Sequence, residues 1–491
     1  PDRAKISAGK KVKFMKPTSD AFTEKSRDAL ANETLQGALA KLSKGFPLKR
    51  FNAVTRLDEF DDIRDAGRDI KTDVLNNLDT YLEQFEAQVI KQGGKVHWAR
   101  TADEACEIIV GLCKDAGARA VTKSKSMIGE EIAINESLEN AGIEPIETDL
   151  GEYIIQLRKE PPSHIIAPAI HLTKGQVAET FKEAHQHLPA DRSLEEPRVL
   201  LDEARQILRQ RFIDADVGIT GANMLVAETG SIVVVTNEGN ADLTMTLPKT
   251  HIAVASLEKI VPTLEDATTL LRLLARSATG QDMSVYTTVV TGPKRDADQD
   301  GPEEFHIVLL DNGRAGMLGG DFHEMLCCIR CGACLNHCPI YKSVGGHAYG
   351  WVYSGQMGSV LIPNLLGIGK TGDLPNASTL CGKCEEVCPV RIPLPDMLRQ
   401  WRTRQFEASA TSTKSRLGIK LWAYCAKRPL LYRFVISFIL SNLRKLGFLI
   451  GREGRFKWLP FAGGWTQIRD FPAPEGKTFI HQYMMSLRGK R

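Results

Sequence analysis

The sequence predicts an α/β domain with a largely parallel sheet, followed by a cysteine-rich domain and a basic helical C-terminal region. Between residues 93 and 312, short β-branched runs alternate with amphipathic stretches, which is typical of strand–helix–strand units. Seven of the eleven cysteines lie between residues 328 and 388. Residues 401–491 hold 18 Lys and Arg but only 4 Asp and Glu, so the basic charge of this +3 chain is concentrated at its end.

Four segments follow from these patterns. Residues 1–57 are polar and basic, and we expect them to form an extended or partly ordered arm. From Asp58 to Lys91 apolar residues recur every three or four positions, which predicts a helix leading into the α/β domain of residues 58–312. The cysteine-rich domain then covers 313–400 and the basic region 401–491.

Six apolar runs of the α/β domain are predicted as strands, and two amphipathic segments as helices between them. The strands are Lys95–Trp98, Ala120–Thr122, His164–Ile166, Ser231–Val235, His251–Val254 and His306–Leu310. The helices are Glu130–Asn140 and Pro197–Arg211.

Composition places the chain among globular proteins. A length of 491 residues predicts two to four domains, and 43% hydrophobic residues with a mean hydropathy of −0.19 are ordinary values. No run approaches the ~18 apolar residues of a membrane span, and the first residues show no apolar signal segment. Clustered free cysteines are typical of a reducing compartment. We therefore expect a protein of the cytoplasm or of the inner face of the cytoplasmic membrane.

The first cysteine motif predicts an iron–sulfur site. Cys328, Cys331 and Cys334 are separated by two residues each, and Cys338 stands directly before Pro339. In two-cluster ferredoxins three such thiolates hold one [4Fe–4S] cluster, and the cysteine before proline ligates the other. Paired cysteines also form zinc sites, but four thiolates within eleven residues ending in Cys-Pro fit iron and sulfide better.

The second motif repeats the end of the first. Cys381, Cys384 and Cys388 carry the same spacing and are again followed by proline. Crossed ligation then predicts a first cluster on Cys328, Cys331, Cys334 and Cys388. The second cluster would use Cys338, Cys381 and Cys384, with Ser378 where a fourth cysteine is expected.

Three outcomes are open for the second cluster: ligation by the serine oxygen, a three-iron cluster, or a cubic cluster with one iron open or externally ligated. The other cysteines are expected to pack as small apolar residues or to have no ligand role. They are Cys106, Cys113, Cys327 and Cys425.

Further motifs resemble those of a known family, the lactate-utilisation iron–sulfur proteins, which form the iron–sulfur subunit of the bacterial L-lactate oxidation complex. The resemblance covers nearly the whole chain beyond the arm. The motifs are Ser124–Met127, Glu147–Leu157, Pro168–His171, Gly218–Asn223, Ala227–Ser231, Leu309–Arg314, Gly345–Gly350 and Trp458–Pro460.

This resemblance implies a lactate-utilisation (LUD) domain of the NagB/RpiA/CoA-transferase-like fold, followed by an α-helical ferredoxin domain. It implies a three-protein system that converts L-lactate to pyruvate, in which this subunit passes electrons through two clusters to a respiratory acceptor. Many family members have cysteine where this chain has Ser378, so a complete second [4Fe–4S] site is not implied.

Two alternative functions are also considered. The LUD domain itself could be a catalytic module acting on a small acid, or the chain could be a regulatory iron–sulfur protein. For a ligand pocket at a strand end, the sequence offers Lys123, Lys125, Asn223 and Glu228. In the alternative interpretation these side chains bind no ligand and only form hydrogen bonds to backbone groups in turns and at helix ends.

The basic C-terminal region mixes charge with apolar residues. Residues 414–457 contain eleven Lys and Arg among aromatic and aliphatic side chains, which predicts a basic amphipathic helix. We expect it to contact other subunits of the complex, a respiratory partner or an anionic membrane surface, with a solvated face as the alternative. Binding to nucleic acid is not expected beside redox clusters.

Overall fold

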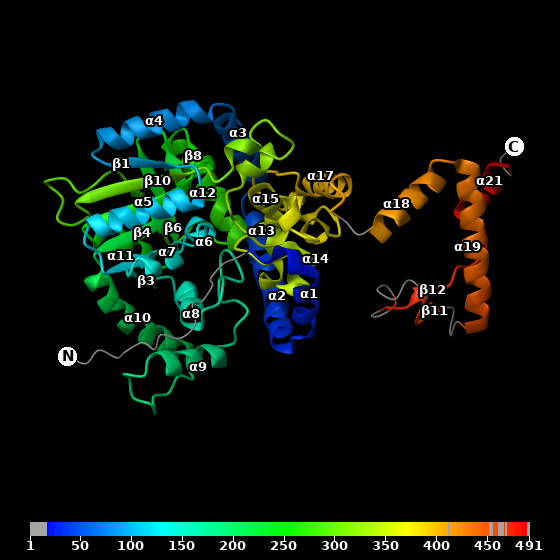
Figure 1. The fold of residues 1–491 in the computed structure, drawn as a ribbon, viewed down its shortest axis with the longest axis horizontal. Coiled ribbons are helices and arrows are strands. Elements are labelled where there is room, and N and C mark those ends of the chain that lie inside the picture. Colours follow the sequence, from blue (N-terminus) through cyan, green and yellow to red (C-terminus); the bar gives the residue numbers. More distant parts are fainter. Residues whose placement is uncertain (1–16, 411–412, 451–454, 460–465, 467–468, 489–491) are drawn as a thin grey trace. The chain divides into compact units, whose positions relative to one another are not determined.

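The structure is a computed structural model that describes residues 17–410, 413–450, 455–459, 466 and 469–488. The chain divides into two compact units, Pro1–Arg404 and Gln405–Arg491. The first unit contains the six-stranded sheet, the four-stranded sheet and the cysteine-rich domain (Figure 1). The second unit consists mainly of helices.

A six-stranded parallel sheet forms the centre of the α/β domain, in the order β1-β10-β7-β4-β2-β3. Both of its faces are covered, because neighbouring residues of one strand enter different cores. In β7, Ile252 and Val254 belong to one apolar cluster, whereas Ala253 and Ala255 belong to another. The strands are β1 (Lys95–Ala99), β2 (Ala120–Lys123), β3 (Glu144–Glu147), β4 (Val217–Gly221), β7 (Thr250–Ser256) and β10 (Glu304–Leu310).

A smaller four-stranded sheet, β8-β5-β6-β9, shares its core with one face of the large sheet. Its strands are β5 (Met224–Val226), β6 (Ser231–Thr236), β8 (Ile260–Val261) and β9 (Tyr286–Val290). The helices of the α/β domain complete the layers. They are α4 (Leu78–Lys91), α5 (Ala102–Asp115), α6 (Met127–Glu131), α7 (Ile134–Asn140), α8 (Leu150–Arg158), α9 (Lys174–Ala184), α10 (Pro197–Asp214), α11 (Asn240–Thr246) and α12 (Leu264–Ala278).

Five of the six predicted strands are confirmed, as β1, β2, β6, β7 and β10. The strand predicted at His164–Ile166 is wrong, because this segment is an irregular buried loop. The imidazole of His164 accepts hydrogen bonds from the backbone N–H groups of Ile166 and Ala167. These bonds replace strand pairing for the two donors.

Two predicted helices are each divided in the structure. The segment Asp58–Lys91 forms α3 (Phe60–Asn76) and α4, since Asn77 leaves helical geometry with φ −129° and ψ 33°. The segment Glu130–Asn140 is interrupted at Ala133, which has a left-handed backbone with φ 52°. The helix predicted at Pro197–Arg211 is confirmed as α10.

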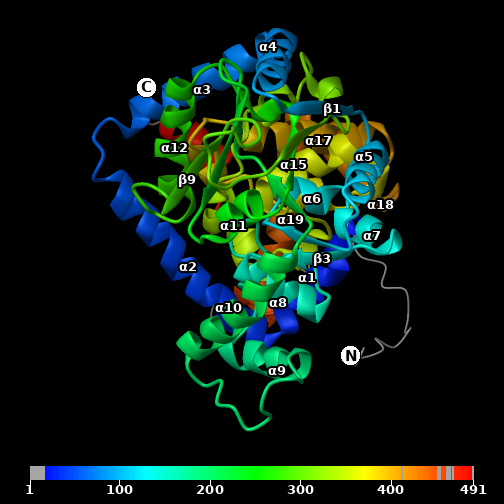
Figure 2. The ribbon, with the colours of Figure 1, turned by 90° about the vertical axis from the view of Figure 1, so that its left-hand side faces the viewer.

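The expectation of an extended arm is wrong for the described residues up to position 57. They form α1 (Phe22–Ala31) and the long α2 (Glu33–Val54), which Figure 2 shows as a diagonal rod. Phe22 packs against the ring of Tyr349 at 5.2 Å, so the first helix lies on the cysteine-rich domain. Burial of apolar groups there outweighs the polar composition of the segment. Residues 1–16 lie outside the described part, as does Pro460 of the C-terminal motif.

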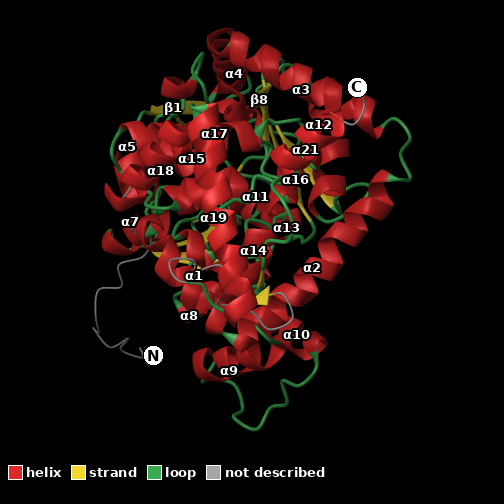
Figure 3. Cartoon of the chain, turned by 90° about the vertical axis from the view of Figure 1, so that its right-hand side faces the viewer, coloured by secondary structure: helices red, strands yellow, loops and turns green. Residues whose placement is uncertain are grey.

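Short helices make up the cysteine-rich domain, and Figure 3 shows helices and loops there. They enclose the largest apolar cluster of the molecule, to which α1, α2, α3 and α12 contribute. The helices are α13 (Ala333–His337), α14 (Pro339–Val344), α15 (Gly355–Leu366), α16 (Lys383–Glu386) and α17 (Leu394–Glu407).

The second unit contains two helices where one basic amphipathic helix is predicted. They are α18 (Thr413–Ala426) and α19 (Pro429–Ile450), followed by the short pair β11 (Arg455–Phe456) and β12 (Phe471–Pro472) and by α21 (Phe479–Arg488). The break coincides with Pro429, which has no N–H for an internal helical bond. Among the described residues no helix is long and apolar enough to cross a membrane.

Candidate metal centres and the adjoining cavity

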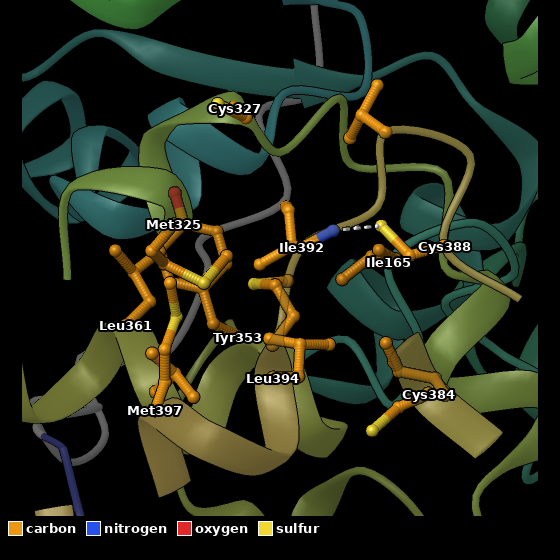
Figure 4. Packing of buried hydrophobic residues seen from close by; sticks show 14 of the residues in the cluster. Ile165, Met325, Cys327, Tyr353, Leu361, Cys384, Cys388, Ile392, Leu394 and Met397 are labelled. Atoms are coloured by element: carbon orange, nitrogen blue, oxygen red, sulfur yellow. Dashed lines mark hydrogen bonds between the residues drawn. The ribbon is translucent and has the colours of Figure 1, made fainter. Parts of the chain in front are cut away.

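Four cysteines of the first set surround one cavity within the large apolar cluster. Cys328, Cys331, Cys334 and Cys388 all line it, although Cys388 is 54 positions further along the sequence than Cys334. Figure 4 shows the Cys388 sulfur among Ile165, Ile392 and Leu394. The arrangement encloses the four sulfurs in a mainly apolar wall.

The two motifs share an unusual backbone. In the first, Arg330 and Gly332 on either side of Cys331 have φ of 61° and 72°. In the second, the neighbours of Cys381 have φ of 55° and 82°. Left-handed residues are uncommon outside glycine. Since both cysteines have a left-handed non-glycine residue before them and a left-handed glycine after them, Cys331 and Cys381 lie in turns of the same kind. This repetition supports the pseudo-symmetric interpretation of the two motifs.

Backbone amides are directed at the sulfurs. The N–H of Ile392 donates to Cys388 Sγ at 3.4 Å, and the N–H of Val390 adds a second bond. Burial raises the pKa of the Cys388 thiol to about 11, while these two donors favour the thiolate. Amides that hydrogen-bond sulfur stabilise anionic ligands and tune a bound cluster.

Buried and half-buried cations lie around the first set. Arg64 donates from Nε to the carbonyl oxygen of Cys388 at 3.1 Å, and Arg50 donates to Val387 at 3.0 Å. Lys71 is 3% exposed and donates to the carbonyl oxygen of Ile260 at 3.4 Å. Thiolate ligands are anionic, so these side chains supply opposite charge where solvent cannot.

The second set is more open. Cys338 and Cys384 are buried, but Cys381 is exposed. Gln356 donates from Nε2 to Cys338 Sγ at 2.8 Å. Ser378 accepts a hydrogen bond at Oγ from the N–H of Leu380, two residues further on, at 3.1 Å.

Ser378 shares a local geometry with the cysteines. Cys331 and Cys381 likewise accept hydrogen bonds from the backbone two residues further on, at Ala333 and Lys383. The serine therefore accepts the same kind of backbone hydrogen bond as these two cysteines, but it carries a hydroxyl instead of a thiol.

The donor set fits a cluster of several irons. Among the residues that the structure describes, no three His, Cys, Asp or Glu side chains converge on a position for a single metal ion. The sulfurs of the first set instead line the wall of a cavity. A cubic cluster requires this arrangement, because each thiolate binds a different iron.

A second, larger cavity of about 290 Å³ adjoins the first set. It opens at the carboxyl ends of three parallel strands, where Ser124 follows β2, Gly221 ends β4 and Ser256 ends β7. Ile165 and Arg330 line both this cavity and the cysteine cavity. One guanidinium thus connects the α/β domain with the first cysteine set.

Two of the four predicted pocket residues line this large cavity. Lys125 and Asn223 do so, with Lys125 paired to Asp149 at 3.4 Å and the Asn223 Oδ1 accepting from the N–H of Val235. The other two do not line it. Lys123 is fully buried in ion pairs with Glu130 and Glu147, and Glu228 accepts a hydrogen bond from the N–H of Leu264 on the surface.

Sequence reasoning did not include Lys259, Arg330 and Tyr353 in the pocket, although all three line it. Arg330 lies over the Tyr353 ring at 5.0 Å and forms an ion pair with Glu258 at 3.3 Å. Its position between two predicted cysteine ligands was the available signal. For Lys259 the sequence offers no comparable signal.

Comparison with known proteins identifies both domains. Residues 82–310 match the LUD domain family, and residues 324–392 match the 4Fe-4S dicluster domain family. Proteins named lactate utilization protein B are 43% identical in Bacillus licheniformis and Bacillus subtilis, each alignment covering 95% of this chain and 96% of the relative. The chain belongs to the lactate utilization protein B family.

The protein of that name from Bacillus thuringiensis is 41% identical over 97% of this chain and 99% of its own length. A solved duf162 family protein from Deinococcus radiodurans is 15% identical and covers 48% of this chain and 98% of its own, with a TM-score of 0.27 that is too low for a comparison of folds. As a member of the lactate utilization protein B family, the chain has a LUD domain followed by a ferredoxin-type domain with iron–sulfur clusters.

Proposed function

We propose that this lactate-utilisation iron–sulfur protein is the electron-transfer subunit of an L-lactate-oxidising complex. Two cysteine sets in one small domain carry this proposal. The names of the relatives supply the substrate, since they are called lactate utilization proteins. Oxidation of L-lactate to pyruvate releases two electrons and two protons, and bound iron–sulfur clusters supply one-electron transfer.

We assign the ligands by the crossed scheme. Cys328, Cys331, Cys334 and Cys388 hold the first cluster, a [4Fe–4S] cube. Cys338, Cys381 and Cys384 hold the second, a [4Fe–4S] or [3Fe–4S] cluster with Ser378 at the position of the missing ligand. Cys331 interacts electrostatically with Cys328 and Cys388, and Cys384 with Cys338 and Cys381, as this grouping requires, while Cys334 interacts with Cys388 of its own set and also with Cys384 of the other.

The surrounding residues prepare both sites for anionic ligands. The apolar wall excludes water from the first set, and Arg50, Arg64 and Lys71 balance its charge. Around the second set, Gln356 orients Cys338 by donating to its sulfur.

We further propose a cytoplasmic location and partners among the other subunits of the complex. The basic C-terminal region is a suitable contact for a respiratory partner or an anionic membrane surface, since α18 and α19 expose Leu417, Trp422 and Phe434 beside their Lys and Arg. The proposed domain limits are 58–312 for the LUD domain, 313–400 for the cluster domain and 401–491 for this region.

The test is reduction of the clusters by lactate. Anaerobically purified chain is mixed with L-lactate, with and without the other subunits, and electron paramagnetic resonance (EPR) follows the reduced clusters. We expect reduction only when the other subunits are present. Clusters that stay oxidised in the complete system while pyruvate is formed would contradict electron transfer by this chain.

A second function is favoured by the large cavity beside the first cysteine set. The LUD domain would then oxidise the small acid itself and use the clusters as its electron outlet. The isolated chain would in that case oxidise L-lactate with an artificial acceptor. The same experiment separates the two functions, because the subunit proposal requires no turnover by the isolated chain.

A further inference from the structure

The large cavity lies where open α/β sheets bind ligands. From β2 the chain continues to β3 on one side, whereas β4 lies on the other side of β2 and leads onward to β7. Between β2 and β4 the direction of winding reverses, and ligands of such sheets bind at the carboxyl ends of the strands at this reversal. A volume of about 290 Å³ is at the lower end of small-molecule sites. The position and size therefore suit a small metabolite.

The wall of the cavity holds a cation without a direct partner. Lys259 follows β7 and forms no ion pair or hydrogen bond with any residue in the described part of the chain. By contrast, Lys125 is paired with Asp149 at 3.4 Å. Lys259 is half-buried, and an ammonium group that loses part of its hydration without gaining a partner is destabilised, so an anionic ligand would stabilise it.

Arg330 adds a second positive group. Its guanidinium binds Glu258 at 3.3 Å through Nη2, and Nη1 donates to the Met357 sulfur at 3.5 Å. Glu258 is shared with Arg314, whose Nε lies 3.1 Å from the same carboxylate. Arg314 is also paired with Glu131 at 2.6 Å, so two carboxylates match the two guanidinium groups, and Arg330 is the member of this network that lines the cavity.

Hydroxyl groups and two carboxylates also line the wall; of the carboxylates, Asp149 is paired with Lys125, and Glu238 is exposed. Ser124 and Ser256 line the cavity at the ends of β2 and β7, and their hydroxyl groups form no hydrogen bond within the described residues. A hydroxyl group both donates and accepts. These two side chains can therefore bind a hydroxyl or carbonyl oxygen next to an anionic group.

We propose that this cavity binds a small carboxylate with an oxygen on its second carbon, with Lys259 and Arg330 as counter-charges and Ser124 and Ser256 at that oxygen. The binding rests on the cavity itself, and only the choice of lactate or pyruvate as the natural ligand rests on the proposed function. Since Arg330 also lines the cysteine cavity, the bound anion lies beside the first cluster.

The competing explanation assigns the cations to the cluster alone. Arg330 borders both cavities and can neutralise either anion. Of the two cavities Lys259 lines only the large one, although it also interacts electrostatically with Cys328. The two explanations thus differ most for Lys259, which makes it the residue to test.

The experiment is calorimetric titration of the anaerobic, cluster-loaded full chain with pyruvate, L-lactate, propionate and inorganic phosphate. We expect pyruvate or L-lactate to bind more tightly than propionate, which lacks the second oxygen. Lys259→Met should weaken binding more than tenfold, and Lys259→Arg should restore most of it. The matched control is Lys249→Met, since Lys249 is exposed at the opposite end of β7, and its affinity should equal that of the wild type.

A second readout follows the neighbouring cluster. Saturating pyruvate should lower the reduction potential of the first cluster in the wild type and not in Lys259→Met, because an anion is added nearby. Absence of binding by any carboxylate, equal binding by Lys259→Met, or phosphate binding as tight as pyruvate would overturn the proposal. These results test only binding to the cavity. The electron-transfer function is tested by reduction of the clusters in the complete lactate system, so either proposal can fail while the other holds.

Discussion

The two cysteine motifs have the same local backbone, but the two ligand sets that they form have different surroundings. Each motif presents its central cysteine between left-handed residues and ends in Cys-Pro. Cysteines of both sets contribute to the main apolar cluster, but only the first set lies among cations from α2 and α3 and borders the cavity of the LUD domain. The second set leaves Cys381 exposed and has serine at one ligand position. A duplicated motif has thus given two sites whose chemistry depends on their neighbours.

The contrast indicates a division of roles. Burial and compensating charge suit the first site for holding its cluster stably beside the large cavity. Exposure of the second site suits exchange of electrons with another protein, because short distances to a partner require a site near the surface. Hydrogen bonds to sulfur, net charge and exposure all change cluster potentials, so the two sites should be distinguishable.

The largest expected effect is loss of one ligand from the first set. Cys388→Ser should remove about four irons per chain and lower the melting temperature, because Arg64 and Lys71 would keep their charge without the anionic cluster. Cys381→Ser should reduce iron content with a smaller change in melting temperature, since that cysteine is exposed. Iron analysis measures the iron content, and thermal unfolding measures the melting temperature. A larger drop in melting temperature for Cys381→Ser than for Cys388→Ser would contradict the proposed difference between the two sites.

Completing the second set should have the next largest effect. Ser378→Cys would supply a fourth thiolate at a position where the backbone already donates a hydrogen bond to the side chain, as it does to Cys331 and Cys381. We expect the second cluster to survive exposure to air several times longer than in the wild type, followed by its EPR signal. Ser343→Cys on α14 adds an exposed thiol elsewhere and serves as the control. Equal lifetimes in all three proteins would show that the second cluster already has a strong fourth ligand.

A pH effect tests the loop that joins the two cavities. Burial lowers the pKa of His164 to about 4, with Lys125 adding to the effect, and the ring lies among Phe46, Tyr341 and Asn336. The unfolded chain therefore binds the proton more strongly between pH 6.5 and 4, and stability is lost as the pH falls through this range.

Between pH 7 and 5 this one group should contribute a loss of about 2 kcal/mol in the free energy of unfolding. The contribution is the difference in pH slope between the wild type and His164→Gln, measured by chemical denaturation. Identical slopes would mean that the His164 ring is accessible to protons in the folded state.

The smallest effect concerns one hydrogen bond. Gln356→Leu removes the donor to Cys338 Sγ and should lower the potential of the second cluster only. A bond worth about 1.4 kcal/mol corresponds to roughly 59 mV for one electron. Redox titration followed by EPR resolves the two clusters, and an equal shift in both would contradict the assignment of Cys338 to the second.

Sequence alone predicted the parts of the fold that local patterns determine. The β-branched runs at Ser231–Val235 and His306–Leu310 became strands because their side chains are buried. Two strands of the large sheet escaped detection for clear reasons. β3 contains Pro145 and is tolerated because it lies at the edge of the sheet, and β4 contains two glycines.

The candidate site likewise has a part that short motifs predict and a part that they do not. Spacing alone predicted that the seven cysteines are cluster ligands, since this chemistry depends on short motifs. The cavity depends on residues brought together over long sequence distances, such as Ser124, Lys259 and Arg330. The prediction that Lys123 lines the pocket was wrong for the same reason, because its burial against Glu130 and Glu147 depends on the packing of three different elements.

The most direct test of the account is EPR spectroscopy of the wild-type chain, as isolated and after reduction with dithionite, together with iron and zinc analysis. The account predicts about seven to eight irons per chain, no stoichiometric zinc and two distinct cluster signals, one of them typical of a cube with four thiolates. A chain that contains zinc and no iron, or two clusters with indistinguishable signals, would contradict it.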